Sequence, residues 1–458
     1  MQSLKVTLIL GLFFLFSLVS LALFFNLDGE ANFSSLATRS TDATKKNSAT
    51  GSREFEKSEV ISKTDKVENE PSALFNDPAI KQAWGLKKSD AARAWKVTKG
   101  SKDIIVAVID TGIDIHHEDL KDNLWKNPGE IGLDKNGKDK STNNIDDDKN
   151  GYVDDVYGWN FVSNTADLTD NHGHGTHIAG IIGAMAGNQK GISGIAPDVS
   201  LMIIKYYDPK VTSTDNLKNT INSINYAIKM GAQIINYSGG GTDYSQDEFD
   251  AVKKAEKNGI LFVAAAGNER SNSDQFHYYP ADYKLSNIIS VTALDPSKEV
   301  LASSNFGIET VDLAAPGQNI ISTLPGNSYG FMTGTSQATA FVSGAAVLVK
   351  ANKTEFKFDD IKRYILSTGD PSTTLAQKTR TSRSLNLFKS LTILDQGMSA
   401  NGIVVSTPVN EVFTTKSDAK LNPDSSTGSL FGKSLLEAVQ KSNPKPRLGG
   451  KKDSQDIP

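Results

Sequence analysis

The sequence predicts an α/β fold in which a mainly parallel, twisted sheet carries helices on both faces. Short apolar runs alternate with segments of helical periodicity from residue 74 to about residue 394, which is the pattern of consecutive βαβ units. The strand candidates are residues 104–109, 201–204, 234–237, 261–266 and 288–291. Apolar residues at helical spacing predict one intervening helix: Leu217, Ile221, Ile224 and Ile228. Ser245 and Glu248 predict another, because together they can form a capping box.

The segments outside this predicted domain, residues 74–394, are polar except for the extreme N-terminus. Residues 26–73 are predicted to be a spacer or pro-segment and residues 395–458 a C-terminal tail, since neither is apolar enough to order itself. The apolar run 6–25 is as long as the roughly 20 residues that span a bilayer. Residues 1–25 are therefore either a signal peptide or a membrane anchor. Lys5 precedes the run and should stay inside, which places the rest of the chain outside the cytoplasm.

The composition excludes several functional classes. Lys and Arg number 49 against 53 Asp and Glu, a net charge of -4. No basic stripe is present, so nucleic acid is not an expected partner. The chain has no cysteine, which rules out disulfides, thiolate metal sites and a cysteine nucleophile. We expect the protein to act as a monomer.

Asp110 is the first candidate for chemistry. It ends the apolar run 104–109 and precedes Thr111 and Gly112, so it should lie at the carboxyl end of a buried parallel strand, where α/β proteins build their sites. The alternative is an aspartate that caps a turn. The motif D-T-G also occurs in aspartic peptidases, but these need two carboxylates that share a proton, and no second such motif is present.

A histidine-rich segment supplies the second candidate. Residues 170–180 read D-N-H-G-H-G-T-H-I-A-G and contain His172, His174 and His177. A zinc peptidase helix would need a glutamate between its two histidines, and none is present. The small and apolar residues that follow predict a buried helix with His174 in its first turn, facing the strand ends. That placement favours a general base over a metal ligand.

Ser336 is the third candidate. It lies in G-T-S-Q-A-T-A-F-V-S-G, ahead of a helix that is apolar nearly all round. At the positive end of a helix, free backbone N–H groups favour an anion that develops beside the nucleophile. The G-x-S-x-G elbow of lipases and esterases is not matched, because Ala338 replaces its second glycine.

The three motifs V-I-D-T-G-I-D, H-G-T-H-I-A-G and G-T-S-Q-A resemble, in this order, the signatures of the subtilase family of subtilisin-like serine peptidases. The resemblance runs from about Asn76 to Leu394 and includes I-N-Y-S-G-G-G and A-A-A-G-N. It implies a subtilisin-like fold and peptide hydrolysis through an acyl-enzyme. Asp110 would orient the imidazole, His174 would take and return the proton, and Ser336 would attack the substrate carbonyl.

The resemblance also implies oxyanion and substrate groups. Asn268 and the backbone N–H of Ser336 would hold the oxyanion. Ser238, Gly239 and Gly240 would pair with an extended substrate backbone. Tyr278 would lie at the base of the primary specificity pocket and shorten it.

The chain departs from the family's pattern in two places. Ala340 stands where proline is usual after the serine motif, and Phe341 where histidine is usual. Residues 26–72 are short and polar where many subtilases carry an apolar folding domain, so the route of maturation is not predicted.

An aspartate-rich loop predicts calcium. Asp146, Asp148 and Asn150 form D-x-D-x-N-G, with Asp154 close behind, and such oxygen-rich loops bind hard cations. The final glutamate of an EF-hand loop is missing, because Tyr157 stands in its place. The alternative is a solvated run of charges.

A second calcium site is implied by the resemblance alone. Asp77, Asp119 and Asn188 match the side-chain ligands of a site that the family shares. Backbone carbonyls would complete it, from Met185, Lys190 and Ile192.

The sequence thus predicts an extracytoplasmic, calcium-stabilised serine endopeptidase that acts on polypeptides. A rival hypothesis is a binding protein that has lost activity on the same scaffold. The residues present at every triad and oxyanion position favour the enzyme.

Overall fold

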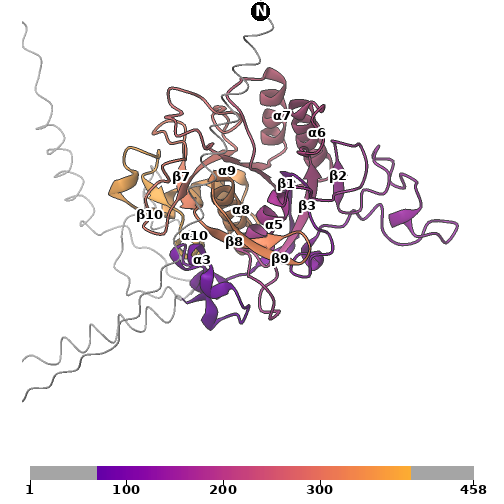
Figure 1. The fold of residues 1–458 in the computed structure, drawn as a ribbon, viewed down its shortest axis with the longest axis horizontal. Helices are drawn as coiled ribbons and strands as arrows, with labels where there is room; N and C mark the ends of the chain where they lie inside the picture. The colour runs from indigo at the N-terminus through magenta and orange to yellow at the C-terminus, as the bar shows by residue number, and fades with distance from the viewer. Residues whose placement is uncertain (1–69, 394–458) are drawn as a thin grey trace, which may run out of the picture. The chain divides into compact units, whose positions relative to one another are not determined.

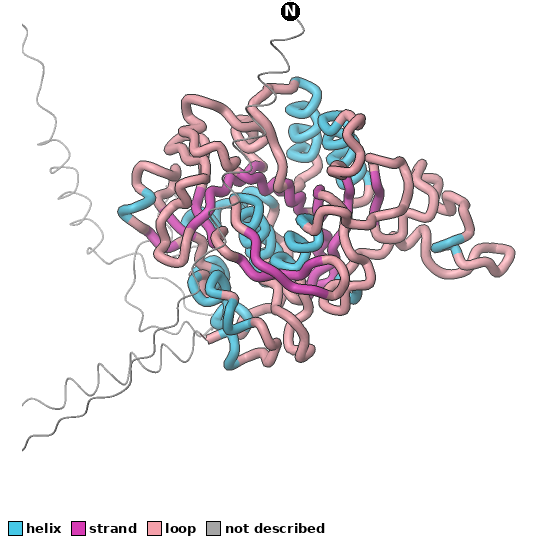
Figure 2. The backbone as a smooth tube through the Cα atoms, in the orientation of Figure 1, coloured by secondary structure: helices cyan, strands magenta, loops and turns pink. Residues whose placement is uncertain are grey.

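The computed structural model describes residues 70–393. In this part of the chain a nine-stranded sheet lies between two layers of helices (Figure 1, Figure 2). In spatial order its strands are β10 (Asp370–Pro371), β11 (Arg383–Ser384), β7 (Leu313–Pro316), β6 (Ile288–Leu294), β5 (Leu261–Ala265), β4 (Ile234–Tyr237), β1 (Gly100–Asp110), β3 (Asp198–Lys205) and β2 (Gly158–Asn160). Every neighbouring pair is parallel except β10 and β11. The predicted α/β fold with a mainly parallel sheet is confirmed.

The five strands expected from the sequence are β1, β3, β4, β5 and β6, and their ends differ by a few residues from the predicted ranges. The largest difference is at the start of β1, where four polar or small residues, 100–103, precede the apolar run. The strands that the apolar pattern missed are β2, β7, β8 (Ile320–Leu324), β9 (Ser328–Met332), β10 and β11. The antiparallel hairpin of β8 and β9 forms a separate two-stranded sheet.

Helices cover both faces because the β1 side chains alternate between two cores. Val106 and Val108 belong to the core that also contains α5 and α8 residues, whereas Ala107 and Ile109 belong to the core shared with α6 and α7. The helices are α3 (Trp84–Lys88), α4 (Ala91–Trp95), α5 (His174–Gly183), α6 (Asn216–Lys229), α7 (Gln246–Lys257), α8 (Thr335–Asn352), α9 (Phe358–Thr368) and α10 (Leu387–Thr392).

The predicted helices α6 and α7 are present, with two differences in detail. Leu217 is 46% exposed, so the apolar stripe of α6 begins later than its spacing indicates. Ser245 caps α7 by accepting from the Glu248 N–H at 3.2 Å. The Glu248 carboxylate accepts from the Tyr283 hydroxyl at 2.8 Å instead of returning to the Ser245 backbone. The capping box is therefore half formed, because a buried phenol competes for the carboxylate.

Phe341, one of the two departures from the family's pattern, is a packing residue. Its side chain is buried on α8, and a Cβ atom on Gly85 would lie 2.5 Å from its Cζ. Helix α3 therefore approaches Phe341 closely because position 85 has no side chain.

No helix among residues 70–393 is long and apolar enough to cross a membrane. The run 6–25, residues 26–69 of the spacer and the C-terminal tail lie outside the described residues, whereas the end of the spacer forms η1 (Pro71–Ala73). Their predicted roles therefore stay predictions.

The carboxyl ends of β1, β4 and β5 meet at one edge of the sheet. Ile109 pairs with Tyr237, and Tyr237 pairs with Ala264. The residues that follow these strands, Asp110 and Ser238 among them, therefore become neighbours in space.

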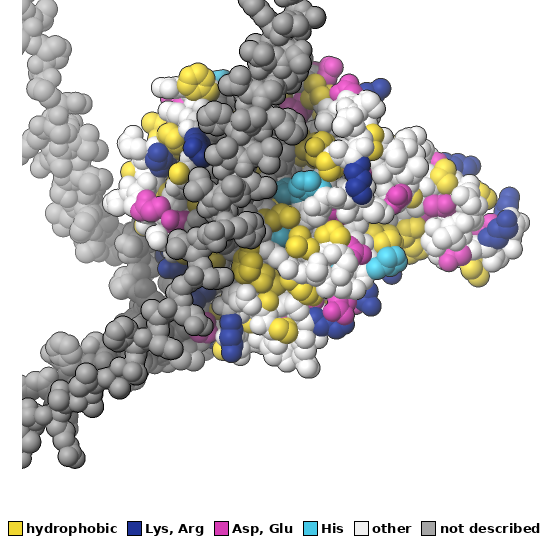
Figure 3. Space-filling view, in the orientation of Figure 1, with side chains coloured by type: hydrophobic (Ala, Val, Ile, Leu, Met, Phe, Trp, Pro, Cys, Tyr) yellow, Lys and Arg dark blue, Asp and Glu magenta, His cyan; other side chains and the backbone are white. Residues whose placement is uncertain are grey.

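A long segment leaves this framework between η3 (Lys121–Asn123) and β2. It contains η4 (Lys140–Thr142) and extends away from the sheet as an arm on the right of Figure 2. The aspartate-rich loop belongs to this arm. On the visible part of the face in Figure 3, acidic and basic side chains are interspersed, in line with the small net charge of -4.

Candidate active site

Asp110 and His174 form a direct pair. Asp110 is the last residue of β1 and His174 the first residue of α5, and Asp110 Oδ1 lies 2.7 Å from His174 Nδ1. Because a carboxylate only accepts, Nδ1 carries the proton and Nε2 is left as the basic nitrogen. The Asp110 side chain is 4% exposed and that of His174 21% exposed, so the acid is buried and the base is accessible.

The surroundings of His174 favour its protonated form. Burial lowers the pKa of the His174 imidazole, but the charge of Asp110 and its hydrogen bond outweigh burial and raise the pKa above its ordinary value. A base of raised pKa accepts a proton more readily.

The two neighbouring histidines do not join this pair. His177 is buried and its Nε2 donates to the Ile320 carbonyl at 3.0 Å. Burial lowers the pKa of His177 to about 4, helped by the nearby His174. His172 is exposed. The three imidazole rings therefore have different environments, which favours a general base at His174 over a metal site shared by the three histidines.

Ser336 is the second residue of α8, at the helix N-terminus that faces the strand ends. It is 8% exposed, and its hydroxyl donates to the Ser238 carbonyl at 3.1 Å. Among the described residues this hydroxyl therefore bonds to the residue after β4 and not to His174. A serine hydroxyl changes partner by rotating about one bond, and catalytic hydrogen bonds often tighten only with substrate.

Asn268 follows β5 and lies against the same helix end. Its Oδ1 accepts from the Thr335 N–H at 3.0 Å, which fixes the orientation of the amide. The residue is exposed, and its Nδ2 donates to no other group in the described part of the chain. The Ser336 N–H is one of the first in α8 and so has no acceptor within the helix. Two N–H donors thus remain available beside the serine.

The predicted substrate segment lies along this edge. Ser238 and Gly239 are half-buried and Gly240 is exposed, so backbone groups are accessible. The segment is held from behind by two backbone hydrogen bonds between Gly241 and Tyr279, of 2.9 and 2.7 Å. At Gly240 the φ angle is +155°, and a Cβ atom there would lie 2.4 Å from the Tyr278 ring. Glycine is therefore required at this position.

Tyr278, the residue predicted at the base of the primary pocket, lies beside the predicted substrate segment. Its ring lies between the substrate segment and the Asn268 turn, since a Cβ atom on Gly267 would also lie 3.0 Å from it. Burial, with the charge of Glu269, raises the pKa of Tyr278 to about 12. The ring is therefore neutral at ordinary pH.

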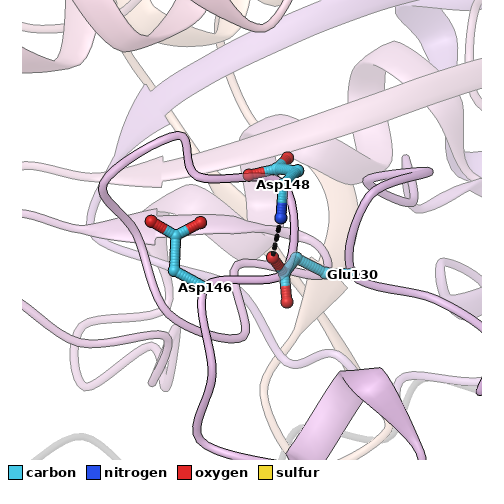
Figure 4. A group of neighbouring side chains, drawn as sticks. All are labelled: Glu130, Asp146 and Asp148. Carbon is cyan, nitrogen blue, oxygen red and sulfur yellow. Dashed lines mark hydrogen bonds between the residues drawn. The ribbon is translucent and has the colours of Figure 1, made fainter. Parts of the chain in front are cut away.

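The arm brings Asp146 and Asp148 together with Glu130, a residue that the sequence motif did not single out. Ligand oxygens of the three carboxylates lie within 4.8 Å of one another. Figure 4 shows the three side chains, with a bond from the Asp148 N–H to the Glu130 carboxylate. Glu130 has no exposed surface, and its Oε2 has no hydrogen-bond partner among residues 70–393. Burial raises the pKa of Glu130, and the charges of Asp148 and Asp155 add to the effect.

The other two predicted ligands of this loop have different partners. Asn150 Nδ2 donates to Asp148 at 3.1 Å and to Asp155 at 3.0 Å. Asp154 accepts from the Asn144 N–H at 3.2 Å and is not part of the group of three carboxylates.

The residues of the second predicted calcium site meet at one loop, residues 185–193, which contains Asn188 and contacts Asp77 and Asp119. Asp77 accepts from the Gly187 N–H at 2.8 Å and from the Ser193 hydroxyl at 2.6 Å. Asp119 accepts from Asn188 Nδ2 at 2.6 Å and from the Tyr329 hydroxyl at 3.0 Å. The three residues are therefore neighbours, but the amide nitrogen of Asn188 faces Asp119, and a cation there would require the oxygen to face it.

The comparisons with known proteins agree with this geometry. The family model described as "Subtilase family" matches residues 101–399. The chain is 39% identical over 273 residues to "Major intracellular serine protease" of Bacillus subtilis (strain 168), covering 59% of this chain and 76% of that protein. It is 34% identical over 275 residues to "Thermitase" of Thermoactinomyces vulgaris, with shares of 60% and 84%. It is also 34% identical over 287 residues to "Thermophilic serine proteinase" of Bacillus sp. (strain AK1), with shares of 61% and 62%.

Proposed function

The chain belongs to the subtilase family and is a serine endopeptidase, and on this premise we propose that Asp110, His174 and Ser336 are its catalytic triad. The observation that carries this assignment is the 2.7 Å contact between Asp110 Oδ1 and His174 Nδ1. It fixes the tautomer that a general base needs. Asn268 is proposed as the oxyanion donor.

The proposed reaction begins when the Ser336 hydroxyl turns from the Ser238 carbonyl to His174 Nε2. Its oxygen attacks the peptide carbonyl carbon, and the hydroxyl proton moves to Nε2. The imidazolium is stabilised by the buried Asp110. Asn268 Nδ2 and the Ser336 N–H donate to the oxyanion. Nε2 then gives the proton to the departing amine, and water hydrolyses the acyl-enzyme by the same steps in reverse order.

The proposed substrate is an extended polypeptide. The accessible backbone of Ser238, Gly239 and Gly240 supports this, because main-chain pairing accepts many sequences. Tyr278 then limits the side chain that enters the primary pocket.

A covalent label tests the nucleophile directly. A fluorophosphonate reacts with an activated serine, so incubation of the full chain should add one label to the peptide that contains Ser336. The matched control is Ser336→Ala, which should take up none. A label on another serine, or none on the parent protein, would remove Ser336 from this role.

We further propose that the arm binds calcium through Glu130, Asp146 and Asp148. The buried, unpartnered Oε2 of Glu130 supports this, because a carboxylate oxygen without a donor is costly unless a cation compensates it. A bound cation would supply that positive charge. Asn150 and Asp154 would act as supports of the loop or as further ligands.

A second calcium site at Asp77, Asp119 and Asn188 is also proposed. Its support is that one loop brings all three together, with carbonyls of Met185, Lys190 and Ile192 in the same segment. The carboxylate oxygens named here already accept hydrogen bonds, so this site is expected to be the weaker of the two.

Calorimetric titration of Ser336→Ala protein with calcium tests both sites, since this variant cannot digest itself. Two binding events are expected. Glu130→Gln should remove one, and Asp119→Asn the other. The control is Asp139→Asn, an exposed carboxylate on the arm that accepts from Ser141, which should change neither. Unchanged titrations in both ligand variants would contradict the proposal.

The proposed location is outside the cytoplasm, with the peptidase domain acting as a monomer. The support is the apolar run 6–25 behind Lys5 and a candidate site drawn from a single chain. N-terminal sequencing of protein from the producing cell, together with membrane fractionation, distinguishes a cleaved signal from an anchor. Light scattering of the purified protein measures its oligomeric state.

A further inference from the structure

Asp170 and Thr111 form a buried link between β1 and α5, the two elements that carry Asp110 and His174. Thr111 directly follows Asp110, and Asp170 lies four positions before His174. Their exposed fractions are 5% and 7%. The Thr111 hydroxyl donates to Asp170 Oδ1 at 2.8 Å and accepts from the Gly175 N–H at 2.9 Å. Thr111, which follows Asp110, is thus hydrogen-bonded to Gly175, which follows His174.

The Asp170 carboxylate also bonds to the segment that carries His174. Its Oδ1 also accepts from the N–H groups of His172 and Gly173, at 3.0 and 2.7 Å. Its Oδ2 accepts from the N–H and the hydroxyl of Thr176, at 2.9 and 2.7 Å. With Thr111, it therefore satisfies first-turn donors of α5 that have no acceptor within the helix.

Two glycines show how closely the elements meet. A Cβ atom on Gly175 would lie 2.1 Å from the Gly112 carbonyl oxygen, and one on Gly112 would lie 2.4 Å from the Leu168 carbonyl oxygen. The end of β1 and the first turn of α5 are in backbone contact here. A small change in the link therefore moves Asp110 relative to His174.

We infer that Asp170 and Thr111 are positioning residues of the catalytic pair: they fix α5 against the end of β1 and place a second negative charge beside the base. The inference rests on the proposed triad. Neither residue contacts the substrate segment or Ser336 through a described hydrogen bond. They act through Asp110 and His174.

The charge of Asp170 gives the inference a measurable sign. Burial raises the pKa of Asp170, but its hydrogen bonds outweigh burial and hold that pKa below the ordinary value. Asp170 is therefore ionised, and its charge supports the raised pKa of His174. Asp170→Asn should therefore lower the pKa of His174. Since His174 must be neutral to act as a base, the acidic limb of the rate profile should then move to lower pH.

The other charged or titratable groups around His174 do not reproduce this effect. Asp110 is the partner itself, His172 is exposed with its ring 6.1 Å away, and His177 is held neutral by burial. Strand β8 has no charged residue, and the charged residue of α8 is Lys350, near its far end. In β3 and the loop after it, Lys205 pairs with Asp208 at 2.7 Å. Burial, with the charge of Asp110, raises the pKa of the Tyr206 hydroxyl, so this group stays neutral.

The experiment compares four variants of the full chain, with kcat, KM and pH profiles measured on one peptide substrate. Thr111→Val, which removes the hydroxyl, should lower kcat by about 10- to 100-fold, as small misplacements of catalytic groups do. KM should change little. Thr111→Ser keeps the hydroxyl and should restore most of the rate. Asp170→Asn should move the acidic limb to lower pH.

The matched control is Asp167→Asn on the same loop. Asp167 accepts from the Thr169 N–H and hydroxyl, at 3.0 and 2.6 Å, and has no described hydrogen bond to Thr111 or α5. Its profile should match that of the parent protein. If Asp170→Asn fails to fold, the comparison of Thr111→Val with Thr111→Ser tests the inference.

A Thr111→Val enzyme with the parent kcat, or an unmoved acidic limb in folded Asp170→Asn protein, would overturn the inference. Failure of this inference can be distinguished from failure of the proposed triad. If only the inference fails, Ser336→Ala still abolishes activity; if the triad assignment fails, Ser336→Ala does not abolish it.

Discussion

Two groups of carboxylates, one at the sheet edge and one on the arm, differ in what compensates their charge. At the sheet edge, Asp110 accepts from an imidazole at 2.7 Å. On the arm, Glu130 is fully buried, and its Oε2 accepts no hydrogen bond from any residue that the structure describes. No Lys or Arg in the described part of the chain forms an ion pair with Glu130, Asp146 or Asp148. A carboxylate paired with an imidazole can assist proton transfer. Carboxylates without a protein cation beside them are suited to bind a metal cation.

The comparison makes the two groups separable by experiment. Changes at the sheet edge should reduce turnover and leave unfolding almost unchanged, because the catalytic groups lie at the surface end of a large core. Changes on the arm should alter unfolding and leave turnover of the folded enzyme almost unchanged. A variant that alters both properties equally would break the distinction.

The largest expected effect is that of Ser336→Ala. Removing the attacking oxygen should reduce kcat by about 10⁶-fold, the size of loss known for subtilisin itself. Melting should stay close to that of the parent protein, measured with an irreversible inhibitor to prevent autolysis. Activity within about tenfold of the parent would be incompatible with Ser336 as the nucleophile.

Asn268→Leu should have the next largest effect. It removes one of two donors to the oxyanion, which costs roughly 10²–10³ in kcat. KM should change little, because the donor acts mainly on charge that develops in the transition state. An unchanged kcat would mean that Asn268 serves only to accept from the Thr335 N–H through its Oδ1.

Calcium removal tests the other side of the comparison. An ion present at a hundredfold excess over its dissociation constant stabilises the folded state by about 2.7 kcal/mol. In Ser336→Ala protein, chelation should therefore lower the melting temperature by several degrees, and added calcium should restore it. Glu130→Gln should remove part of this dependence, whereas Asp139→Asn should not. Identical melting with and without calcium would leave the arm as a solvated run of charges.

The sequence predicted the sheet edge better than the arm, for a physical reason. Asp110, His174 and Ser336 each lie at the end of a strand or helix whose apolar pattern is local and readable, and parallel strands bring such ends to one edge. Glu130 lies in N-P-G-E, far from D-x-D-x-N-G in sequence. Glu130 reaches Asp148 only because of the path that the arm takes in the folded chain. No periodic pattern in the sequence indicates that these two residues are close.

Other differences have the same origin. Strand β2 has three residues, too few for a pattern, and the half-formed cap of α7 depends on the phenol of Tyr283, which belongs to a distant loop. The link between Thr111 and Asp170 is in the same class. Each residue lies inside a recognised motif, but their hydrogen bond joins two motifs and is visible only in the fold.

The smallest expected effect, a change of preference without loss of catalysis, concerns Tyr278. Its ring occupies the space between Gly240 and Gly267, with atoms 2.4 and 3.0 Å from where their Cβ atoms would be. Tyr278→Gly should empty that space, so larger side chains before the scissile bond should be cleaved relatively faster and small ones more slowly. The matched control is Phe276→Gly, since Phe276 is 69% exposed and nearby in sequence. A peptide-library profile measures the preference. If the profile does not move, or moves equally in the control, Tyr278 packs the loop and does not shape the pocket.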